Sequence, residues 1–411
     1  MVQFEEFELK NGLRVVVHPD TTTQMGVLNL MYNVGSRDEH EQKTGFAHLF
    51  EHLMFGGSKH VANFDSELQK VGGDNNAFTS PDVTNYYITL PAVNMETAFW
   101  VESDRMLHLN LDHKSLEVQR KVVIEEFKQR YLNQPYGDVW LKLRPLAYTM
   151  HPYKWATIGK EIQHIEEATL DDVEAFFNKF YSPNNAVLVV GGNVEVKEIE
   201  RLATKWFEPI PRGDDHLRKL LIEPKQTQKR TLTVNADVPA NALYKSYHMC
   251  DRLHSDYYAT DLLSDIAGRG KSSRLHQKLV QEKQLFTSIS SYIMGSFDPG
   301  MCVVNGMLRD GISFDEAEQG IDTVLQEIQN ETITEDELFK VKNQAESTIE
   351  FGRVEILERC MGLAYGAIVG NTNQLNEEPA SIQEVTLAQI NRIAQEILRN
   401  ENSSTLYYQS N

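Results

Sequence analysis

Apolar and polar residues alternate along the first part of the chain, which predicts paired strands. Phe4–Val17 alternates in this way except at Asn11 and Gly12, two residue types that tolerate the positive φ angles of a tight hairpin turn. Met25–Val34 predicts another strand, and Ala77–Leu90 predicts two strands joined by a turn at Ser80–Asp82.

Helical spacing of apolar residues occurs between these strands. In Thr44–Gly56 the apolar residues recur at intervals of three and four, and a glycine pair then ends the pattern. The same reasoning predicts helices at Phe64–Val71, Asn94–Leu107, Lys114–Leu132 and Thr169–Phe180, and a short buried strand at Ala186–Val190. Strands and helices mixed in this order predict an α+β fold.

A second unit follows a segment rich in proline and charge. Pro209–Gln228 contains three prolines and a glycine, which indicates a linker. Beyond it the order of elements recurs, and the strand-to-helix segment Leu90–Leu109 has a counterpart at Met307–Ile328. We therefore predict two duplicated domains, residues 1–210 and 229–411, joined by a linker at 211–228. Each is expected to hold a largely antiparallel sheet packed with helices on one side.

The composition is that of a soluble globular protein. Of the 411 residues 41% are hydrophobic and 24% are charged, and the formal net charge is −19. This charge repels nucleic acids and anionic membranes, so neither is expected as a partner. No apolar run has signal-peptide or membrane-spanning length, which predicts a cytoplasmic protein, or a periplasmic one if a leader was removed. Three widely spaced cysteines predict neither disulfides nor a cysteine zinc site.

Two histidines on the helix predicted at Thr44–Gly56 are the strongest chemical signal. His48 and His52 are four residues apart, so both imidazoles share a helix face and can bind one metal ion. Glu51 lies beside them and can reach a water at that ion. Catalytic zinc takes three protein ligands and keeps one position open, so a distant carboxylate is expected as the third ligand. A pair of surface histidines without metal is the alternative.

The third ligand is expected from the helix predicted at Lys114–Leu132. Neighbouring residues on a helix point about 100° apart, so only one of Glu125 and Glu126 can face a given site. Glu125 shares its stripe with Lys128, which indicates solvent, whereas Glu126 stacks over Val122 and Val123, which indicates the interior. An acid on an interior stripe needs a partner, and a divalent ion is one. We therefore predict Glu126, with Glu125 as the alternative.

These residues predict peptide hydrolysis without a covalent intermediate. Zinc lowers the pKa of water and polarises a carbonyl, and Glu51 would take the water proton and pass it to the leaving amine. The remaining histidines are scattered and predict no second cluster. Among them only His151 is a candidate for supporting the site, and a surface or packed histidine is the alternative.

The motif H-x-x-E-H is the inverzincin signature. The sequence around it resembles the pitrilysin family, which includes insulin-degrading enzyme and the mitochondrial processing peptidase. The resemblance covers nearly the whole chain, through Gly45–Gly57, Asn76–Tyr87, the segment VVIEEF, His151–Tyr153 and Phe180–Val194. It implies that the second glutamate of VVIEEF, Glu126, is a zinc ligand, and Glu126 lies 74 residues beyond His52 (126 − 52), close to the family spacing.

The resemblance also implies a fold and a way of binding substrate. The family pairs related α+β domains, and this chain would form half of a clam-shell peptidase with one zinc ion. Peptide substrates would add a strand to the sheet edge at Asn76–Thr79, where Asn76 and Ala77 are the candidate substrate-binding residues.

One departure from the family pattern concerns an arginine and a tyrosine that bind substrate and stabilise its oxyanion. In the matching segment, Leu279–Ile289, Val280 and Thr287 stand in their places, and neither can perform that role. We therefore expect a heterodimer in which a zinc-free chain of similar length donates the pair, with a homodimer as the alternative. The rival function is a non-catalytic, peptide-holding or assembly subunit.

Overall fold

The computed structural model describes residues 1–330 and 333–411, and the chain divides into two compact units. Unit 1 comprises Met1–Lys128, Trp155–Leu220 and Glu350–Glu378, and unit 2 comprises Gln129–Lys154, Leu221–Ile349 and Pro379–Asn411. The chain passes between the units at Leu220 and Leu221, within the segment expected as a linker. However, each unit also takes a segment from the other half of the sequence, so the units are discontinuous where the prediction was of contiguous domains.

The sheet of unit 1 has the strand order β1-β2-β6-β3-β5-β4. Its strands are β1 (Glu5–Glu8), β2 (Arg14–Pro19), β3 (Met25–Tyr32), β4 (Asp74–Thr79), β5 (Thr84–Pro91) and β6 (Ala186–Gly192). Strand β2 pairs with β6 in parallel and the other pairs are antiparallel, so the sheet is mixed. The predicted hairpin is confirmed, because β1 and β2 pair around Gly12, whose φ is +86°.

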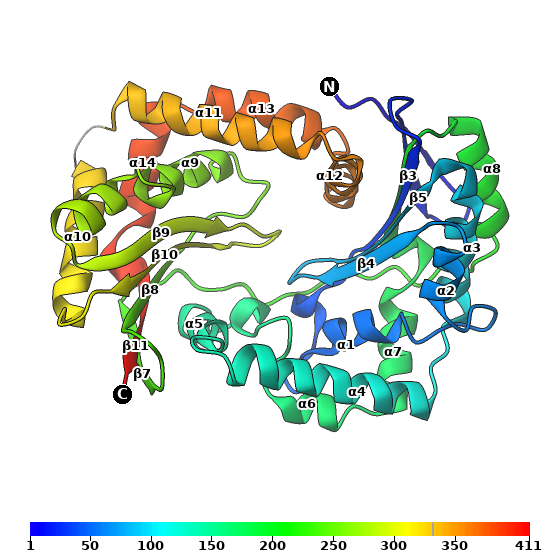
Figure 1. Ribbon diagram of the computed structural model, residues 1–411, viewed down its shortest axis with the longest axis horizontal. Coiled ribbons are helices and arrows are strands. Elements are labelled where there is room, and N and C mark those ends of the chain that lie inside the picture. The colour runs from blue at the N-terminus through cyan, green and yellow to red at the C-terminus, as the bar shows by residue number, and fades with distance from the viewer. Residues whose placement is uncertain (331–332) are drawn as a thin grey trace. The chain divides into compact units, whose positions relative to one another are not determined.

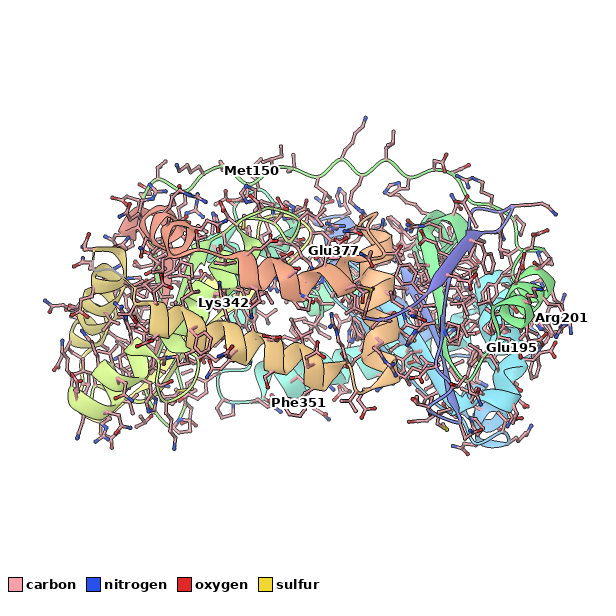
Figure 2. The ribbon with its side chains drawn as sticks, turned by 90° about the horizontal axis from the view of Figure 1, so that it is seen from above. Met150, Glu195, Arg201, Lys342, Phe351 and Glu377 are labelled. Atoms are coloured by element: carbon pink, nitrogen blue, oxygen red, sulfur yellow. The ribbon has the colours of Figure 1, made fainter. Side chains whose placement is uncertain are left out.

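The helices of unit 1 cover both faces of this sheet (Figure 1). They are α1 (Phe46–Leu53), α2 (Phe64–Gln69), α3 (Met95–His108), α4 (His113–Phe127), α6 (Ile162–Glu166), α7 (Leu170–Phe180), α8 (Val196–Trp206) and α12 (Ile356–Ile368). Helix α8 carries Arg201 on its solvent face (Figure 2), where the guanidinium is paired with Glu198. Helix α1, which carries His48 and His52, is shorter than the predicted Thr44–Gly56, and it begins after Gly45, whose φ is +85°.

Two glycines show that helices lie against opposite faces of the sheet. A Cβ at Gly26 of β3 would meet Met95 at the start of α3, and a Cβ at Gly191 of β6 would meet Cys360 of α12. Gly191 is paired across the sheet with Val27, the neighbour of Gly26, so the two glycines face opposite sides. The expectation of helices on one side was therefore wrong for unit 1, because α12 returns from the second half of the sequence to cover the other face.

The sheet of unit 2 has the order β7-β11-β8-β10-β9. Its strands are β7 (Arg230–Ala236), β8 (Ala242–His248), β9 (Phe286–Met294), β10 (Met301–Leu308) and β11 (Ser403–Ser410). Strand β7 pairs with β11 in parallel and the rest are antiparallel, which repeats the arrangement of β2-β6-β3-β5-β4. The predicted α+β class is confirmed, and the repeated strand order supports the internal duplication.

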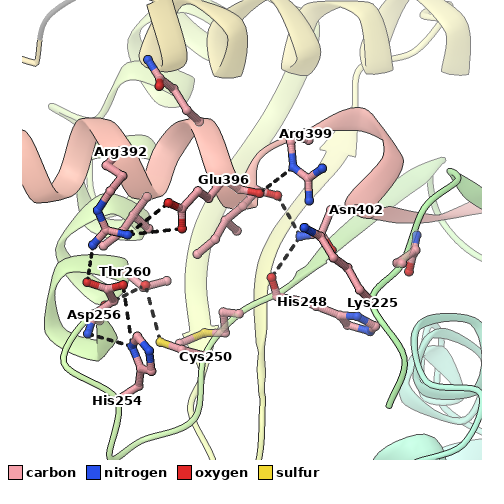
Figure 3. Close-up of a pocket in the computed structure, with 15 residues that line it drawn as sticks. Lys225, His248, Cys250, His254, Asp256, Thr260, Arg392, Glu396, Arg399 and Asn402 are labelled. Atoms are coloured by element: carbon pink, nitrogen blue, oxygen red, sulfur yellow. Dashed lines mark hydrogen bonds and ion pairs between the residues drawn. The ribbon is translucent and has the colours of Figure 1, made fainter. Parts of the chain in front are cut away.

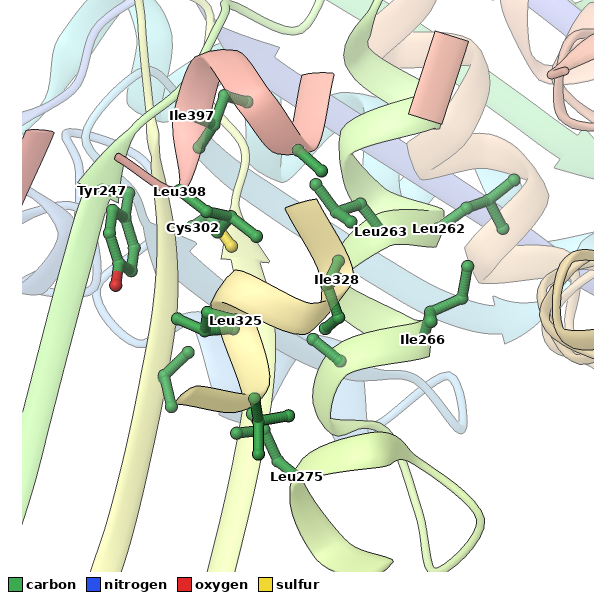
Figure 4. Close-up of a cluster of buried hydrophobic side chains, with 14 of the residues drawn as sticks. Tyr247, Leu262, Leu263, Ile266, Leu275, Cys302, Leu325, Ile328, Ile397 and Leu398 are labelled. Carbon is green, nitrogen blue, oxygen red and sulfur yellow. The ribbon is translucent and has the colours of Figure 1, made fainter. Parts of the chain in front are cut away.

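The main core of unit 2 lies between one face of its sheet and several of its helices (Figure 4). The helices that belong to this unit wholly or in large part are α5 (Val139–Ala147), α9 (Tyr257–Gly268), α10 (Phe314–Asn330), α11 (Glu335–Gly352), α13 (Gln374–Glu384) and α14 (Leu387–Ile397). Ile266 of α9, Ile328 of α10 and Ile390 of α14 are fully or almost fully buried in this core. Helix α5, from the first half of the sequence, packs on β7, β8 and β11, through a separate cluster around Leu143 and Leu406.

A charged cluster is also buried in unit 2. The Lys245 ammonium on β8 lies 3.0 Å from Oε1 of Glu318 and is also paired with Asp322, both on α10. Glu318 further accepts hydrogen bonds from Lys229 at 2.7 Å and Tyr407 at 2.6 Å. Burial raises the pKa of Glu318, but Lys245 and the other donors outweigh it and hold the pKa at about 2.

None of the described helices combines the length and the apolar character that a bilayer crossing requires.

Candidate metal centre

The helix that carries the histidines is anchored at its start and along its apolar face. The carboxylate of Glu39 accepts hydrogen bonds from the backbone N–H groups of Gly45 at 2.9 Å and Ala47 at 2.8 Å. These are N–H groups of the first turn that have no partner within the helix. Burial raises the pKa of Glu39 well above its usual value, against the opposing effect of the two N–H donors. The apolar side chains Phe46, Leu49, Phe50 and Leu53 are buried on the other side of α1.

Two imidazoles of α1 and one carboxylate of α4 meet at a single point. Nε2 of His52 lies 3.3 Å from Oε2 of Glu126, and Nε2 of His48 lies 3.6 Å from the same oxygen. Zinc–ligand distances of about 2.0–2.2 Å place two ligand atoms of a tetrahedral site about 3.4 Å apart. The three residues offer ligand atoms that all lie within 4.8 Å of one another. This spacing fits one shared metal ion.

The structure brings Glu126 to the histidines and turns Glu125 away from them. The Glu126 side chain is 16% exposed, whereas that of Glu125 is 61% exposed and lies 2.8 Å from the Lys128 ammonium. Val123, which stacks with Glu126, is fully buried, but Val122 is 44% exposed. The prediction that the neighbours of Glu126 on its helix face lie in the interior is therefore correct for Val123 and wrong for Val122.

Glu51 lies on α1 between the two histidines and is held by a neighbouring strand. The hydroxyl of Thr79, the last residue of β4, donates to Oε2 of Glu51 at 2.5 Å. Sequence reasoning did not select Thr79, although period-two alternation places it on the same face of the strand as Ala77. Two buried tyrosines lie nearby. Burial raises the pKa values of Tyr86 and Tyr181, and the charge of Glu51 adds to this effect.

Strand β4 is the last strand of the unit 1 sheet in the described order, so one of its margins has no neighbouring strand in that sheet. It carries the predicted substrate-binding residues, Asn76, which is exposed, and Ala77, which is half-buried. The backbone N–H of Ala77 donates to Oδ1 of the preceding Asn76 at 2.8 Å. This local bond satisfies a donor that a strand margin would otherwise present to another chain.

The sequence matches family models of peptidase family M16 in two regions. Residues 14–159 match the model described as insulinase, peptidase family M16, and residues 167–345 match the model of the M16 peptidase inactive domain. The zinc protease PqqE of Helicobacter pylori is 31% identical over 411 residues, which cover 98% of this chain and 92% of that protein. The chain belongs to peptidase family M16.

Solved structures agree with this M16 assignment. The crystal structure of a protease from Helicobacter pylori matches with a TM-score of 0.94 at 29% identity, over 100% of both chains. Pitrilysin matches with a TM-score of 0.78 at 18% identity, over 99% of this chain and 45% of that one. The second match shows the fold alone, and in that fold this M16 chain corresponds to one half of the longer protein.

The positions expected for the family's arginine and tyrosine lie in unit 2 of this M16 chain. Val280 is in a π-helical turn (His276–Glu282), where its side chain packs against the unit 2 core. Thr287 is exposed on β9, and its hydroxyl donates to the carbonyl of Met307 at 3.2 Å. Neither side chain offers a cation or a phenol. His151 also lies in unit 2 and is buried. Its Nε2 lies 3.4 Å from Asp298 and its ring packs against Tyr153, so it is a packed histidine.

Unit 2 also contains a pocket of about 700 Å³ that is lined by both polar and apolar residues (Figure 3). Arg392 lines this pocket, and its guanidinium is paired with Asp256 at 2.6 Å and with Glu396 at 3.1 Å. None of the residues that the sequence selected for catalysis or metal binding lines it.

The cysteines of this M16 chain are poorly suited to nucleophilic catalysis. Burial raises the pKa of Cys250 to about 11 and those of Cys302 and Cys360 to about 12. A thiol with such a pKa is protonated near neutral pH, and the thiolate is the nucleophilic form.

Proposed function

We propose that this chain is a zinc metallo-endopeptidase subunit that hydrolyses peptides or unfolded polypeptide segments. The observation that carries the proposal is the convergence of His48, His52 and Glu126, with Glu51 beside them. Relatives named as zinc proteases support the same assignment.

The donor set fits zinc. Two imidazole nitrogens and one carboxylate oxygen are the ligand types of hydrolytic zinc sites, and three protein ligands leave a position for water. His48, His52 and Glu126 would hold one ion. When bound, zinc acts as a Lewis acid that lowers the pKa of water and polarises the carbonyl of the scissile bond.

Glu51 would act as the general base and then as the general acid. Its carboxylate accepts the proton of the attacking water and passes this proton to the nitrogen of the leaving amine. The hydrogen bond from Thr79 holds one oxygen of the carboxylate and so restricts the orientation of the general base. Thr79 is therefore a positioning residue.

The margin of β4 would bind the substrate as an added strand. Backbone hydrogen bonds between strands provide affinity with little side-chain selectivity, which suits unfolded segments of varied sequence. The Ala77 N–H would exchange its bond with Asn76 for a carbonyl of the substrate. Because β4 ends at Thr79, a peptide on this margin would run towards Glu51.

A partner chain would complete the oxyanion-binding part of the site. Val280 and Thr287 lack the donors that the family pattern places there, and loss of such donors removes a large part of transition-state stabilisation. We propose a heterodimer with a zinc-free M16 chain of similar length that carries the arginine and tyrosine. A homodimer is the alternative.

The test measures zinc content and peptide cleavage with the purified full-length chain. We expect zinc at about one equivalent at the His48–His52–Glu126 site and weak cleavage by the chain alone. Strong cleavage is expected once a similar-length M16 chain with the arginine–tyrosine pair, from the same genome, is added. Glu51→Gln should retain zinc and abolish cleavage in both conditions. Full turnover by the chain alone would reject the partner, and absence of zinc would reject the peptidase.

The rival function is a non-catalytic subunit that holds peptides or supports assembly. Val280 and Thr287 are the observation in its favour. Zinc binding without cleavage, even with the partner present, would support this rival. A double variant, Val280→Arg with Thr287→Tyr, separates the two further, because it should raise cleavage by the isolated chain only if the missing donors limit the reaction. Thermal unfolding would establish that the variant is folded, since Val280 packs against the core.

A further inference from the structure

We propose that His60, Asp104 and His108 form a second binding site for a divalent transition metal in unit 1. Their side chains offer ligand atoms that all lie within 4.8 Å of one another. The cluster shares no residue with the site formed by His48, His52 and Glu126, so it does not depend on the proposed function. It also corrects the expectation that the remaining histidines form no second cluster.

Two of the ligands come from one helix and are aligned by its geometry. Asp104 and His108 are four residues apart at the end of α3, so their side chains lie on one face. The Asp104 side chain is 6% exposed. A buried carboxylate needs partners, and those of Asp104 are Ser58 and His60.

The third ligand comes from the loop between α1 and α2, and backbone hydrogen bonds fix this loop against α3. Ser58 and Leu109 form an isolated antiparallel bridge, and the Lys59 N–H donates to the carbonyl of His108 at 3.0 Å. The Asn110 N–H donates to the carbonyl of Gly57 at 3.1 Å. The position of His60 relative to His108 is thus determined by main-chain contacts just before His60 and at the end of α3, which is the preorganisation that a metal site requires.

The two oxygens of the Asp104 carboxylate have different partners. Its Oδ2 accepts hydrogen bonds from the Ser58 hydroxyl and from the His60 backbone N–H, the latter at 3.0 Å. Its Oδ1 faces the His60 ring, with Nδ1 at 2.6 Å. The hydrogen bonds to Oδ2 fix the orientation of the carboxylate, and Oδ1 would bind the metal.

The 2.6 Å contact is a hydrogen bond, and a metal would replace its proton. Ligands must be deprotonated to bind, so a proton is released when the metal enters. Two atoms around one zinc ion lie about 3.4 Å apart, so the His60 ring must move by less than about 1 Å. The side chain is 53% exposed and can make this movement. The ring centroids of His60 and His108 are 5.5 Å apart.

The ligand types identify the class of metal. Two imidazoles and one carboxylate suit zinc, nickel and copper, whereas calcium and magnesium take oxygen ligands. The site is half-exposed at His60, so water would fill the remaining coordination positions. Metal bound here would join the α1–α2 loop, which follows directly on the helix of His48 and His52, to the end of α3.

The experiment measures zinc bound to the full-length chain after chelation and equilibrium dialysis, by elemental analysis. The wild-type chain should bind about two equivalents, and His52→Ala and His108→Ala should each bind about one. The double variant should bind none, and the surface variant His40→Ala should keep both. Cobalt(II) added to His52→Ala should give a visible absorption band that is absent after further exchange of His60 or His108.

Two results would overturn the proposal. One is a single zinc equivalent in the wild-type chain that His52→Ala removes completely. The other is a second equivalent that survives in both His60→Ala and His108→Ala. His60→Ala changes an exposed side chain, so it remains informative even if a substitution on α3 disturbs folding. Loss of this second equivalent alone leaves the peptidase proposal intact, because zinc at His48 and His52 and cleavage would persist.

Discussion

Exchange of Glu126 for glutamine should weaken zinc binding strongly while leaving the fold intact. Both histidine contacts converge on Oε2 of Glu126, at 3.3 and 3.6 Å, so this oxygen is common to the whole site. Structural zinc sites with four ligands bind with about 10–16 kcal/mol at pH 7, so one ligand contributes on the order of 3 kcal/mol. An amide oxygen has no net charge, and loss of 3 kcal/mol corresponds to a Kd about 150-fold higher.

Glu125→Gln is the matched control for this experiment. It removes the same charge from the neighbouring position of α4, and its carboxylate contacts Lys128 at the surface. The assay is competition for zinc against a chelator of known affinity, with circular dichroism to compare the folds. We expect Glu125→Gln to bind zinc within about threefold of the wild type, since an exposed charge is screened by solvent. Equal weakening by both substitutions would refute the assignment of Glu126 as a ligand, because only the shared charge would then matter.

Three further predictions test the parts around the metal and the core of unit 2. Thr79→Val should lower kcat about tenfold with zinc content unchanged, and Thr79→Ser should restore it, because the hydroxyl orients Glu51; steady-state kinetics and zinc analysis measure both. Ala77→Pro should raise KM for peptides about fivefold, because it removes an N–H at the margin of β4, with an unchanged thermal unfolding midpoint as control. Glu318→Gln should lower the free energy of unfolding by about 3 kcal/mol at pH 7, measured with urea, because Lys245 loses a buried partner. Since the pKa of Glu318 is held at about 2, its stabilisation is complete above the ordinary pKa near 4.3 and is lost as pH falls towards 2; an unchanged acid dependence in the variant would contradict this.

Local patterns predicted most strands and helices, but not which sheet each helix packs against. The strand-turn-strand predicted at Ala77–Leu90 is found as β4 and β5, because alternation and turn residues are local signals. No local pattern indicated that α5 packs on the sheet of unit 2 or that α12 packs on the sheet of unit 1. An amphipathic pattern shows that one face of a helix is buried, and both sheets offer a suitable apolar surface.

The same distinction applies to the candidate site. His48 and His52 lie on one helix, so their spacing alone brings them together, and Glu126 could be selected from the burial pattern of α4. Thr79 reaches Glu51 only because of how β4 lies against α1, which no short-range pattern encodes. His60 is brought to Asp104 by the backbone bridge between Ser58 and Leu109, a contact between segments about fifty residues apart in sequence.

The two units show that the metal centre depends on a few side chains and not on the fold that carries them. Both sheets have the same order once β1 is set aside, and each has helices packed against it. Yet α9, the first helix after the β7–β8 pair of unit 2, contains no histidine, whereas α1 carries two. The two units are thus similar scaffolds, and the candidate ligand set lies on unit 1. The same reasoning applies to Val280 and Thr287: a TM-score describes the scaffold and does not report which chemical groups stand at those two positions.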